Sequence, residues 1–339
     1  MFRRIATLLF ALAACTRQAA TAGPAEAQLA TDLPAPVVDT MLTAIAQTGG
    51  PRAERIQGAS LGAAALTDAK GSQQGGDVRW DAEPYGAIAA ARQGDLIPML
   101  PIGNDVPPLW RDRDGLWIAV GGRAVVLLIA TDLLENHPVP NYYAALTQPW
   151  LKGKVAIAAP TGGSSLPNFA ALFRAWGEAR TQSWMTQLRA NAVQVLESDG
   201  DVRQAVVTGK AVVGMLASDE AAKAAASAAH VDIQYPNQAS IGTFVWPTAV
   251  SRPKNPPHPA ASGRLAARLA SLDVEQLLVA RVPGYLPLRT GIPVPPGVTS
   301  AANLRVVSVE PAVIVEEITR RKAELAEWTT AVRRDSAKR

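Results

Sequence analysis

Strand-like and helix-like runs alternate through the middle of this chain, and this alternation is the strongest constraint on its fold. Residues 115–134, "GLWIAVGGRAVVLLIATDLL", are apolar and rich in β-branched side chains, and residues 152–160, "KGKVAIAAP", form a shorter run that ends at a proline. Residues 166–176 place apolar side chains at helical spacing, and residues 201–216 predict a helix that ends near Gly209 before a buried strand. The pattern predicts an α/β protein with largely parallel sheets.

The last third of the chain predicts a loop and two helices. Residues 251–263, "SRPKNPPHPAASG", are rich in proline and predict a loop. Residues 263–282 have the spacing of one amphipathic helix, and the charged segment from Val313 to Arg333 predicts a final helix on the surface. Roughly three hundred residues after the N-terminal segment suffice for two domains or one elaborate domain.

The first residues have the pattern of an export signal. "MFRRIATLLFALAAC" begins with Arg3 and Arg4 and continues with about ten apolar residues before Cys15, whereas a membrane-spanning helix needs roughly 20. We expect residues 1–14 to be a lipoprotein signal peptide, and Cys15, the only cysteine, to be lipidated. The alternative is a soluble-protein signal with a chance cysteine. Residues 15–28 predict a flexible tether.

The charge balance argues against a nucleic-acid partner. The chain has 33 Lys and Arg residues against 29 Asp and Glu residues, a formal net charge of +4. Nucleic-acid-binding domains carry a basic cluster on one face, and no such cluster is visible along this sequence. We therefore expect no nucleic acid among the partners.

The segment "GASLG" (58–62) fits the nucleophile elbow of serine hydrolases. Such an elbow needs a strand before it, a helix after it, and an acid and a histidine later in the chain. The candidate bases for Ser60 are His137, His230 and His258. The alternative is that Ser60 caps a helix over "GAAALTDA", and we favour it because Ser60 precedes most of the predicted sheet.

A glycine- and serine-rich segment, "PTGGSS" (160–165), connects a predicted strand to a predicted helix. Backbone N–H groups at its glycines, its serine hydroxyls and the helix N-terminus together suit a carboxylate, phosphate or carbonate. It has neither the lysine of a Walker loop nor the spacing of a dinucleotide-binding loop. An ordinary glycine-rich turn has the same appearance, so residues 161–165 remain a candidate anion site.

Two acidic segments are candidates for binding a cation. Asp81 and Glu83 lie beside Trp80 and Tyr85, and acids next to aromatic rings attract cations by charge and by cation–π interaction. The alternative is a strand that ends in a solvated acidic turn.

The second acidic segment is "GMLASDEAAKA" (214–224), in which Asp219 and Glu220 stand between an apolar run and an alanine-rich helix. Acids in the first turn of a helix are stabilised by its dipole and Ser218 can cap it, so the alternative is a helix start. The three histidines and the single cysteine show no metal-ligand spacing.

Several motifs occur in an order that resembles that of the ferric-ion-binding type of extracellular solute-binding proteins. These proteins capture solutes for ABC importers. The resemblance runs from about Leu29 to the C-terminal helix. It agrees with the predicted lipoprotein signal peptide, since exported binding proteins are often lipid-anchored. The motifs are, in chain order, "DVRWDAEPYGAIAAARQGDLIPMLP", "DGLWIAVGGRAVVLLIATDLL", "LTQPWLKGKVAIAAPTGGSS", "SDGDVRQAVVTGKAVVGMLASDEAAKA", "PHPAASGRLAARLASLDVEQLLV" and "GYLPLRTGIPVPPG".

This resemblance implies an α/β fold of the two-lobed periplasmic-binding-protein type 2 class, with mixed sheets, crossing hinge strands and a ligand held between the lobes. It also implies a binding protein that is not an enzyme. The implied lobes are residues 29–122 plus 243–295 for lobe 1, and residues 123–242 plus 296–335 for lobe 2.

The resemblance further implies a set of ligand-binding residues. "PTGGSS" is similar to the family's anion-binding loop, Glu83 matches an acid of the cleft, Arg123 matches an arginine at the lobe crossover, and Ser60 falls on a loop that faces the cleft. The residues expected to bind the ligand are Ser60, Trp80, Glu83, Arg123, Thr161, Gly162, Gly163, Ser164, Ser165, Asp199, Asp219 and Glu220.

The chain departs from the ferric binders at Asp219 and Glu220, where those proteins typically have two adjacent tyrosines whose phenolate oxygens suit Fe(III). Tyr142 and Tyr143 do not replace them, because they lie on the far side of "PTGGSS". We expect Asp219, with Glu83 across the cleft, to bind the positive part of the ligand. That ligand is either a metal ion with a companion anion, iron(III) included, or a small zwitterion such as an aminophosphonate or an amino acid.

The sequence thus predicts a lipid-anchored, monomeric binding protein that captures a small charged solute by lobe closure. It would deliver the solute to an ABC permease and ATPase complex in the inner membrane. No resident cofactor is expected, since a bound metal ion would be cargo. The alternatives are a sensor subunit that presents its ligand to a receptor and an exported serine hydrolase that uses Ser60.

Overall fold

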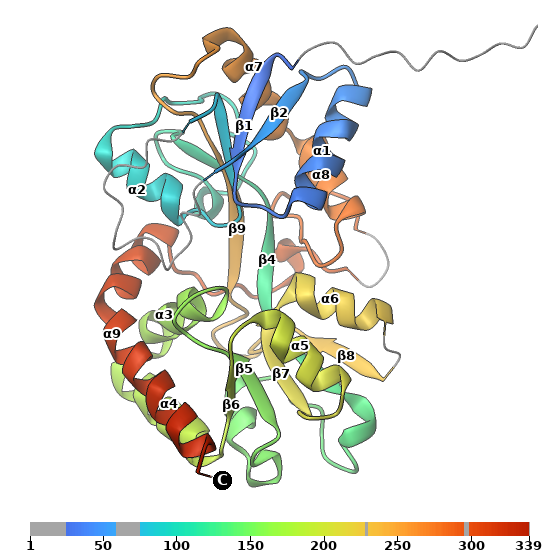
Figure 1. Ribbon diagram of the computed structural model, residues 1–339, viewed down its shortest axis with the longest axis vertical. Coiled ribbons are helices and arrows are strands. Elements are labelled where there is room, and N and C mark those ends of the chain that lie inside the picture. Colours follow the sequence, from blue (N-terminus) through green and yellow to red (C-terminus); the bar gives the residue numbers. More distant parts are fainter. Residues whose placement is uncertain (1–24, 59–74, 228–229, 295–297, 339) are drawn as a thin grey trace, which may run out of the picture.

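A continuous mixed sheet joins two halves of the molecule (Figure 1). The computed structural model describes residues 25–58, 75–227, 230–294 and 298–338, and within them the strand order is β2-β1-β3-β9-β4-β7-β5-β6, with β8 paired to β4. The strands are β1 (Ala27–Thr31), β2 (Ala53–Gln57), β3 (Val78–Asp81), β4 (Trp117–Ala130), β5 (Val155–Ala158), β6 (Gln194–Leu196), β7 (Val213–Ala217), β8 (Val231–Gln234) and β9 (Val245–Ser251).

Strand β4 belongs to both halves. Its first part, from Trp117 to Ala124, pairs with β9, and its second part, from Val125 to Ala130, pairs with β7 and β8. Every pairing of β4 and β9 is antiparallel, whereas β1 with its neighbours and β5 with its neighbours are parallel. The prediction of a strand within 115–134 is confirmed. The expectation of largely parallel sheets was wrong, because the two long crossing strands run against those beside them.

Alternate side chains of β4 enter two different hydrophobic clusters. Val126 and Leu128 belong to one cluster, while Val125 and Leu127 belong to the other. Successive residues of a strand point to opposite faces, so the sheet is covered on both faces by apolar side chains. This explains why residues 115–134 are almost uniformly apolar, as expected of a strand buried on both faces.

Helices cover both faces of the sheet in each half. None of them, within the described part of the chain, combines the length and the apolar character needed to cross a bilayer. The α-helices are α1 (Ala35–Gln47), α2 (Tyr85–Gln93), α3 (Ser165–Trp176), α4 (Glu178–Ala190), α5 (Asp199–Val207), α6 (Ser218–Ser227), α7 (Pro259–Leu269), α8 (Leu272–Arg281) and α9 (Pro311–Ser336). Short 3-10 turns lie at Pro108–Trp110, Thr131–Leu133, Tyr143–Thr147, Pro149–Leu151 and Ala301–Asn303.

The helices predicted around 166–176 and before Gly209 are confirmed as α3 and α5. The segment 263–282 forms two helices rather than one, because the Ser271 hydroxyl accepts a hydrogen bond from the Val274 N–H and starts α8. The proline-rich loop ends earlier than expected, since α7 begins with a proline at its first position.

Helix α9 is longer than predicted and is only partly a surface helix. It packs along α3 and reaches α2, so it connects the two halves along one side of the molecule (Figure 1). Its apolar face buries Ile314, Ile318 and Leu325. Most of its charged residues lie on its other faces, as in an amphipathic helix, but Glu317 and Arg321 are buried and form an ion pair.

Candidate functional site

A pocket of about 570 Å³ lies where α3, α5 and α6 meet the crossing strand β4. Seven of the residues expected to bind a ligand line it, although they come from four segments of the chain. Such pockets, with a few convergent polar groups, are the usual form of small-molecule sites. The lining residues are Arg123, Ala158, Ala159, Thr161, Gly162, Gly163, Glu197, Ser198, Asp199, Gly200, Ala217, Asp219 and Glu220.

The predicted anion loop forms one wall of the pocket. Thr161, Gly162 and Gly163 follow β5 and precede α3, whose N-terminus no side chain caps. In the first turn of α3 the Leu166 N–H already donates to the Gly162 carbonyl and Pro167 has no N–H, so an anion here would bind the N–H groups of the loop itself. Ser164 and Ser165 are buried behind this wall, and the Ser164 hydroxyl donates to Asp199 Oδ1 at 3.0 Å.

A second helix N-terminus enters the same pocket. Ser198 caps α5 through a reciprocal pair of hydrogen bonds with Asp201, and Ser198, Asp199 and Gly200 line the pocket. Burial raises the pKa of Asp199 to about 6, an effect that nearby Asp219 strengthens and the Ser164 hydrogen bond opposes. Asp199 therefore holds a proton more readily than an exposed aspartate does.

Substituting Asp199 with asparagine is expected to stabilise the protein at neutral pH and to have little effect near pH 4. The raised pKa of Asp199, about 6 against an ordinary 3.8, means that the folded state binds the proton more tightly than the unfolded state. The contribution of Asp199 to stability is therefore lost as pH rises from about 4 to about 6. The asparagine side chain carries no charge but still accepts from Ser164, so the variant gains about 1–2 kcal/mol at pH 7.

Urea unfolding at pH 4, 5.5 and 7 measures the free energy of unfolding of both proteins. Asp132→Asn is the control, because it removes a carboxylate charge at an exposed position. A variant that is no more stable than the wild type at pH 7, or equally more stable at all three values, contradicts the expectation.

Arg123 lies on β4 where the strand passes between the two halves. One guanidinium nitrogen is 3.4 Å from Asp219 Oδ2, and another donates to the Ala82 carbonyl at 3.2 Å. The guanidinium also lies over the rings of Trp246 and Tyr285, at 5.0 and 5.7 Å. Burial disfavours the charged form, but Tyr285 and the surrounding acids outweigh it and raise the pKa of Arg123. A permanent positive charge therefore stands at the edge of the pocket.

Asp219 keeps one oxygen free of hydrogen bonds. Its Oδ2 faces Arg123, but Oδ1 is buried and has no hydrogen-bond partner among the described residues. A buried acceptor without a partner is costly, so a ligand donor at Oδ1 would lower the free energy of the complex. The neighbouring Ser218 does not use its hydroxyl to cap α6, which was the alternative interpretation of this segment. Its hydroxyl accepts from the Ala124 N–H and donates to the Gly284 carbonyl instead.

Glu220 lines the pocket but is already paired. One carboxylate oxygen accepts from Arg203 at 2.9 Å and the other from Lys223. Partial burial would raise the pKa of Glu220, but these two cations outweigh it and lower the pKa. A ligand cation would have to compete with both, so Glu220 is a weaker candidate than Asp219.

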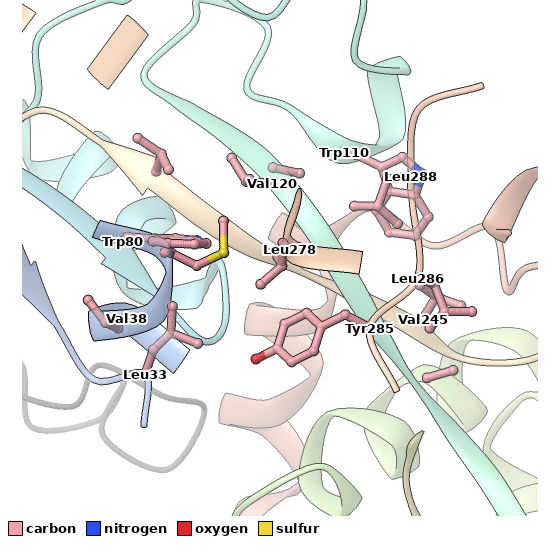
Figure 2. Close-up of a cluster of buried hydrophobic side chains, with 14 of the residues drawn as sticks. Leu33, Val38, Trp80, Trp110, Val120, Val245, Leu278, Tyr285, Leu286 and Leu288 are labelled. Atoms are coloured by element: carbon pink, nitrogen blue, oxygen red, sulfur yellow. The ribbon is translucent and has the colours of Figure 1, made fainter. Parts of the chain in front are cut away.

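Trp80, expected at the site, and Asp81, a candidate for binding a cation, both lie elsewhere. Trp80 is fully buried in the hydrophobic core of the half that contains β1, β2 and β3 (Figure 2). Its indole N–H donates to Thr248. Asp81 forms a buried ion pair with Arg79, and burial raises the pKa of Asp81 to about 6 against the influence of this arginine. The expectation that Trp80 contacts the ligand was wrong, because β3 turns this ring into the core.

Glu83 is close to the site without lining the pocket. It is 8 % exposed, and its charge acts on Arg123, whose pKa it helps to raise. Ser60 and Cys15 lie outside the described residues. No group of three His, Cys, Asp or Glu side chains in the described ranges is arranged to hold a metal ion.

Several residues around the pocket were not predicted from the sequence. Ser198 and Gly200 follow β6 in "ESDGD", and the capping pattern there could have identified a second helix N-terminus beside the first. Trp246 and Tyr285 come from β9 and from the segment after α8, and no local pattern connects them with Arg123. Their place beside the pocket depends on how β4 and β9 pair.

Solved structures with a closely similar fold are known. Iron-bound HitA from Pseudomonas aeruginosa superposes with a TM-score of 0.75 at 20% identity, over 91% of this chain and 99% of that chain. AfuA from Actinobacillus pleuropneumoniae, with fructose-6-phosphate bound, gives 0.75 at 16% identity over the same shares. Trichodesmium IdiA (FutA), in complex with iron and citrate, gives 0.72 at 19% identity, over 90% and 98%. These likenesses confirm the two-lobed α/β fold.

Sequence comparison identifies the family. Iron uptake proteins A1 and A2 of Synechocystis sp. are 25% and 26% identical to this chain over 67% of its length, and the matched regions span 63% and 66% of those proteins. The profile of bacterial extracellular solute-binding proteins matches residues 100–303, more than half of the chain. Membership of a solute-binding family argues against the hypothesis that the protein is a serine hydrolase that uses Ser60. The chain belongs to the bacterial extracellular solute-binding proteins.

Proposed function

We propose that this protein captures a small zwitterionic solute, with an anionic group and an ammonium or similar cationic group, and delivers it to an ABC permease. The observation that carries the proposal is the free Oδ1 of Asp219, which lies in the same pocket as two helix N-termini and Arg123. The pocket thus offers both positive groups for an anion and a carboxylate oxygen for a cation.

The anionic group of the solute would bind at the N-termini of α3 and α5. The N–H groups at Thr161, Gly162 and Gly163 and those at Gly200 present partial positive charges, and Arg123 adds a full one. A carboxylate, phosphate or phosphonate suits such a site. The fructose-6-phosphate in the AfuA structure supports this reading, because it shows that this fold accommodates an organic phosphate.

The cationic group would bind Asp219. Its Oδ1 accepts from no described residue, and its Oδ2 lies at 3.4 Å from Arg123, a distance too long for a strong hydrogen bond. An ammonium group at Oδ1 would satisfy the buried acceptor and complete the charge balance. Asp199, with its raised pKa, would donate or accept at the same solute according to pH.

A metal ion with a companion anion is the second candidate. The names of the Synechocystis relatives and the iron in HitA favour it. Against it, no three suitable side chains cluster within the described residues, and Tyr143 is a core residue whose hydroxyl is bound to Asn168. Carboxylates of Asp219 and Glu83 would then be the ligands, with citrate or carbonate at the helix N-termini.

Lobe closure is part of the proposal. Lobe 1 would comprise residues 29–122 plus 243–295, and lobe 2 residues 123–242 plus 296–335, with β4 and β9 as the crossing strands. Arg123 contacts the Ala82 carbonyl of one half and Asp219 of the other, so it is placed to respond to a ligand in the pocket. Lipidation at Cys15 would hold the monomeric protein at the membrane near its permease and ATPase, or near a receptor if it is a sensor.

Isothermal titration of the mature protein, with Cys15 replaced by serine, tests the proposal. The ligands are 2-aminoethylphosphonate, ethylphosphonate as its counterpart without the amine, fructose-6-phosphate, glycine and Fe(III)-citrate. We expect 2-aminoethylphosphonate to bind more tightly than ethylphosphonate. Asp219→Asn should lower affinity for the amine-bearing ligand about tenfold or more and leave ethylphosphonate nearly unchanged, because a charged hydrogen bond is lost.

The exposed Asp95→Asn is the matched control and should change neither affinity. Tight binding of Fe(III)-citrate that depends on Asp219 would favour the metal candidate instead. Equal affinity for both phosphonates would contradict a cationic subsite at Asp219.

A further inference from the structure

A second pocket, of about 610 Å³, lies at the opposite end of α3 from the first. Trp176 is the last residue of α3, whereas the first pocket surrounds the loop that precedes the helix. A helix of 12 residues spans about 18 Å, so the two pockets are separate and share no lining residue. The second is built from the end of α3, the start of α4, the chain around Tyr142 and the segment between β8 and β9. Its volume is within the range of small-molecule sites.

Two buried N–H donors at this pocket have no partner. The indole N–H of Trp176 and the side-chain NH₂ of Asn237 are buried, and neither donates a hydrogen bond to any described residue. The orientation of the Asn237 amide is fixed, because its Oδ1 accepts from the Tyr143 N–H at 3.1 Å. Buried donors normally find an acceptor, so two of them at one pocket need an explanation.

A positive charge accompanies these donors. The Arg180 guanidinium lies 4.8 Å from the centre of the Trp176 ring, and no carboxylate in the described part of the chain pairs with it. Three groups that donate hydrogen bonds, one of them charged, thus line the same pocket. The acceptor that matches them carries negative charge and more than one lone pair, as a carboxylate does.

Aromatic rings form much of the remaining wall. Tyr142 is 46% exposed although its ring is large and apolar, and Tyr235 and Trp176 also line the pocket. Burial raises the pKa of Tyr235 to about 12, so its hydroxyl stays neutral and does not repel an anion. Flat apolar faces beside a donor cluster suit a planar apolar group attached to an acid.

We propose that this pocket is a second ligand site, which binds a small carboxylate attached to a planar apolar group. The carboxylate accepts from Trp176, Asn237 and Arg180, and the planar group packs against Tyr142 and Tyr235. The site is independent of the solute pocket, because none of its residues takes part there. A cation would be repelled by Arg180, and a neutral ligand would leave that charge unpaired.

Benzoate is the probe, and benzamide is its neutral counterpart of the same shape. In a ¹H–¹⁵N spectrum of the full-length mature protein, the Trp176 indole N–H signal, identified by its loss in Trp176→Phe, should move downfield as benzoate is added. Arg180→Gln should weaken benzoate binding about tenfold and Asn237→Asp should weaken it further, since the new carboxylate repels the ligand while its Oδ1 still accepts from Tyr143. Benzamide should bind at least about tenfold more weakly than benzoate.

Arg189→Gln removes the same charge from the same helix, away from the pocket, and should leave benzoate binding unchanged. Asp219→Asn should also leave it unchanged, which separates this site from the solute pocket. The inference is overturned if millimolar benzoate does not move the Trp176 signal, if benzamide binds equally well, or if Arg180→Gln has no more effect than Arg189→Gln.

Discussion

Substituting Glu275 with glutamine is expected to lower the free energy of unfolding by about 3–5 kcal/mol, as is usual when one partner of a buried ion pair is removed. Glu275 is fully buried, and its Oε1 accepts from the Leu288 and Arg289 N–H groups. Its Oε2 pairs with the Arg289 guanidinium, which is 1% exposed. Glutamine must turn an NH₂ group towards one of these donors, so a buried donor then faces another donor.

Urea unfolding measures the loss, and Asp273→Asn is the matched control on the same helix. Asp273 pairs with Arg268 at 3.1 Å, but its side chain is 73% exposed, so this substitution should cost no more than about 0.5 kcal/mol. Similar losses in the two variants would show that the buried pair contributes no more than a surface one.

Substituting Gly284 with alanine is expected to destabilise the protein by about 3 kcal/mol and to weaken solute binding as well. Gly284 has φ +86°, and an added Cβ would lie 2.3 Å from Asp219 Cα and 2.5 Å from the Ser218 carbonyl oxygen. Both neighbours are backbone atoms at the start of α6, so they cannot rotate away as a side chain would. Relief of the clash must displace Asp219 or the segment that carries Gly284.

Gly291→Ala separates the clash from the backbone strain. Gly291 also has a positive φ, +79°, but a Cβ added there meets no atom within 4 Å. Its substitution should cost only about 1 kcal/mol, the usual cost of a non-glycine residue in this conformation. Equal losses in urea unfolding, with solute affinity unchanged in Gly284→Ala, would contradict the close approach of the two segments.

The helices and strands of the middle of the chain were predictable because their signals are local. The apolar run of β4, the helical spacing of α3 and the glycine that follows α5 are each visible within a few residues. The helix boundary that was predicted wrongly also depends on local structure. The break between α7 and α8 depends on the Ser271 cap within a continuous amphipathic pattern, and that pattern concealed it.

The candidate site was predictable where a motif lies at the end of a strand. Thr161 to Gly163 and Asp219 follow β5 and β7, and neighbouring strands bring their ends together. The position of Trp80 was predicted wrongly because the local pattern does not show which face of a strand a side chain occupies. An aromatic residue beside acids has the same sequence pattern whether its ring faces a ligand or the core, and only the pairing of β3 with β9 decides the face.

The sequence by itself determined the α/β class, the main helices and strands and the position of the glycine-rich loop between β5 and α3, because periodicity, capping and turn chemistry act between residues close in the chain. Only the tertiary structure decided which charges meet. Arg123 and Asp219 lie 96 residues apart, and the Ser218 hydroxyl, for which a helix cap was the alternative, bonds to the Gly284 carbonyl 66 residues away. Local periodicity carries no information on such distant contacts, and the crossing of β4 between the two halves brings these groups together.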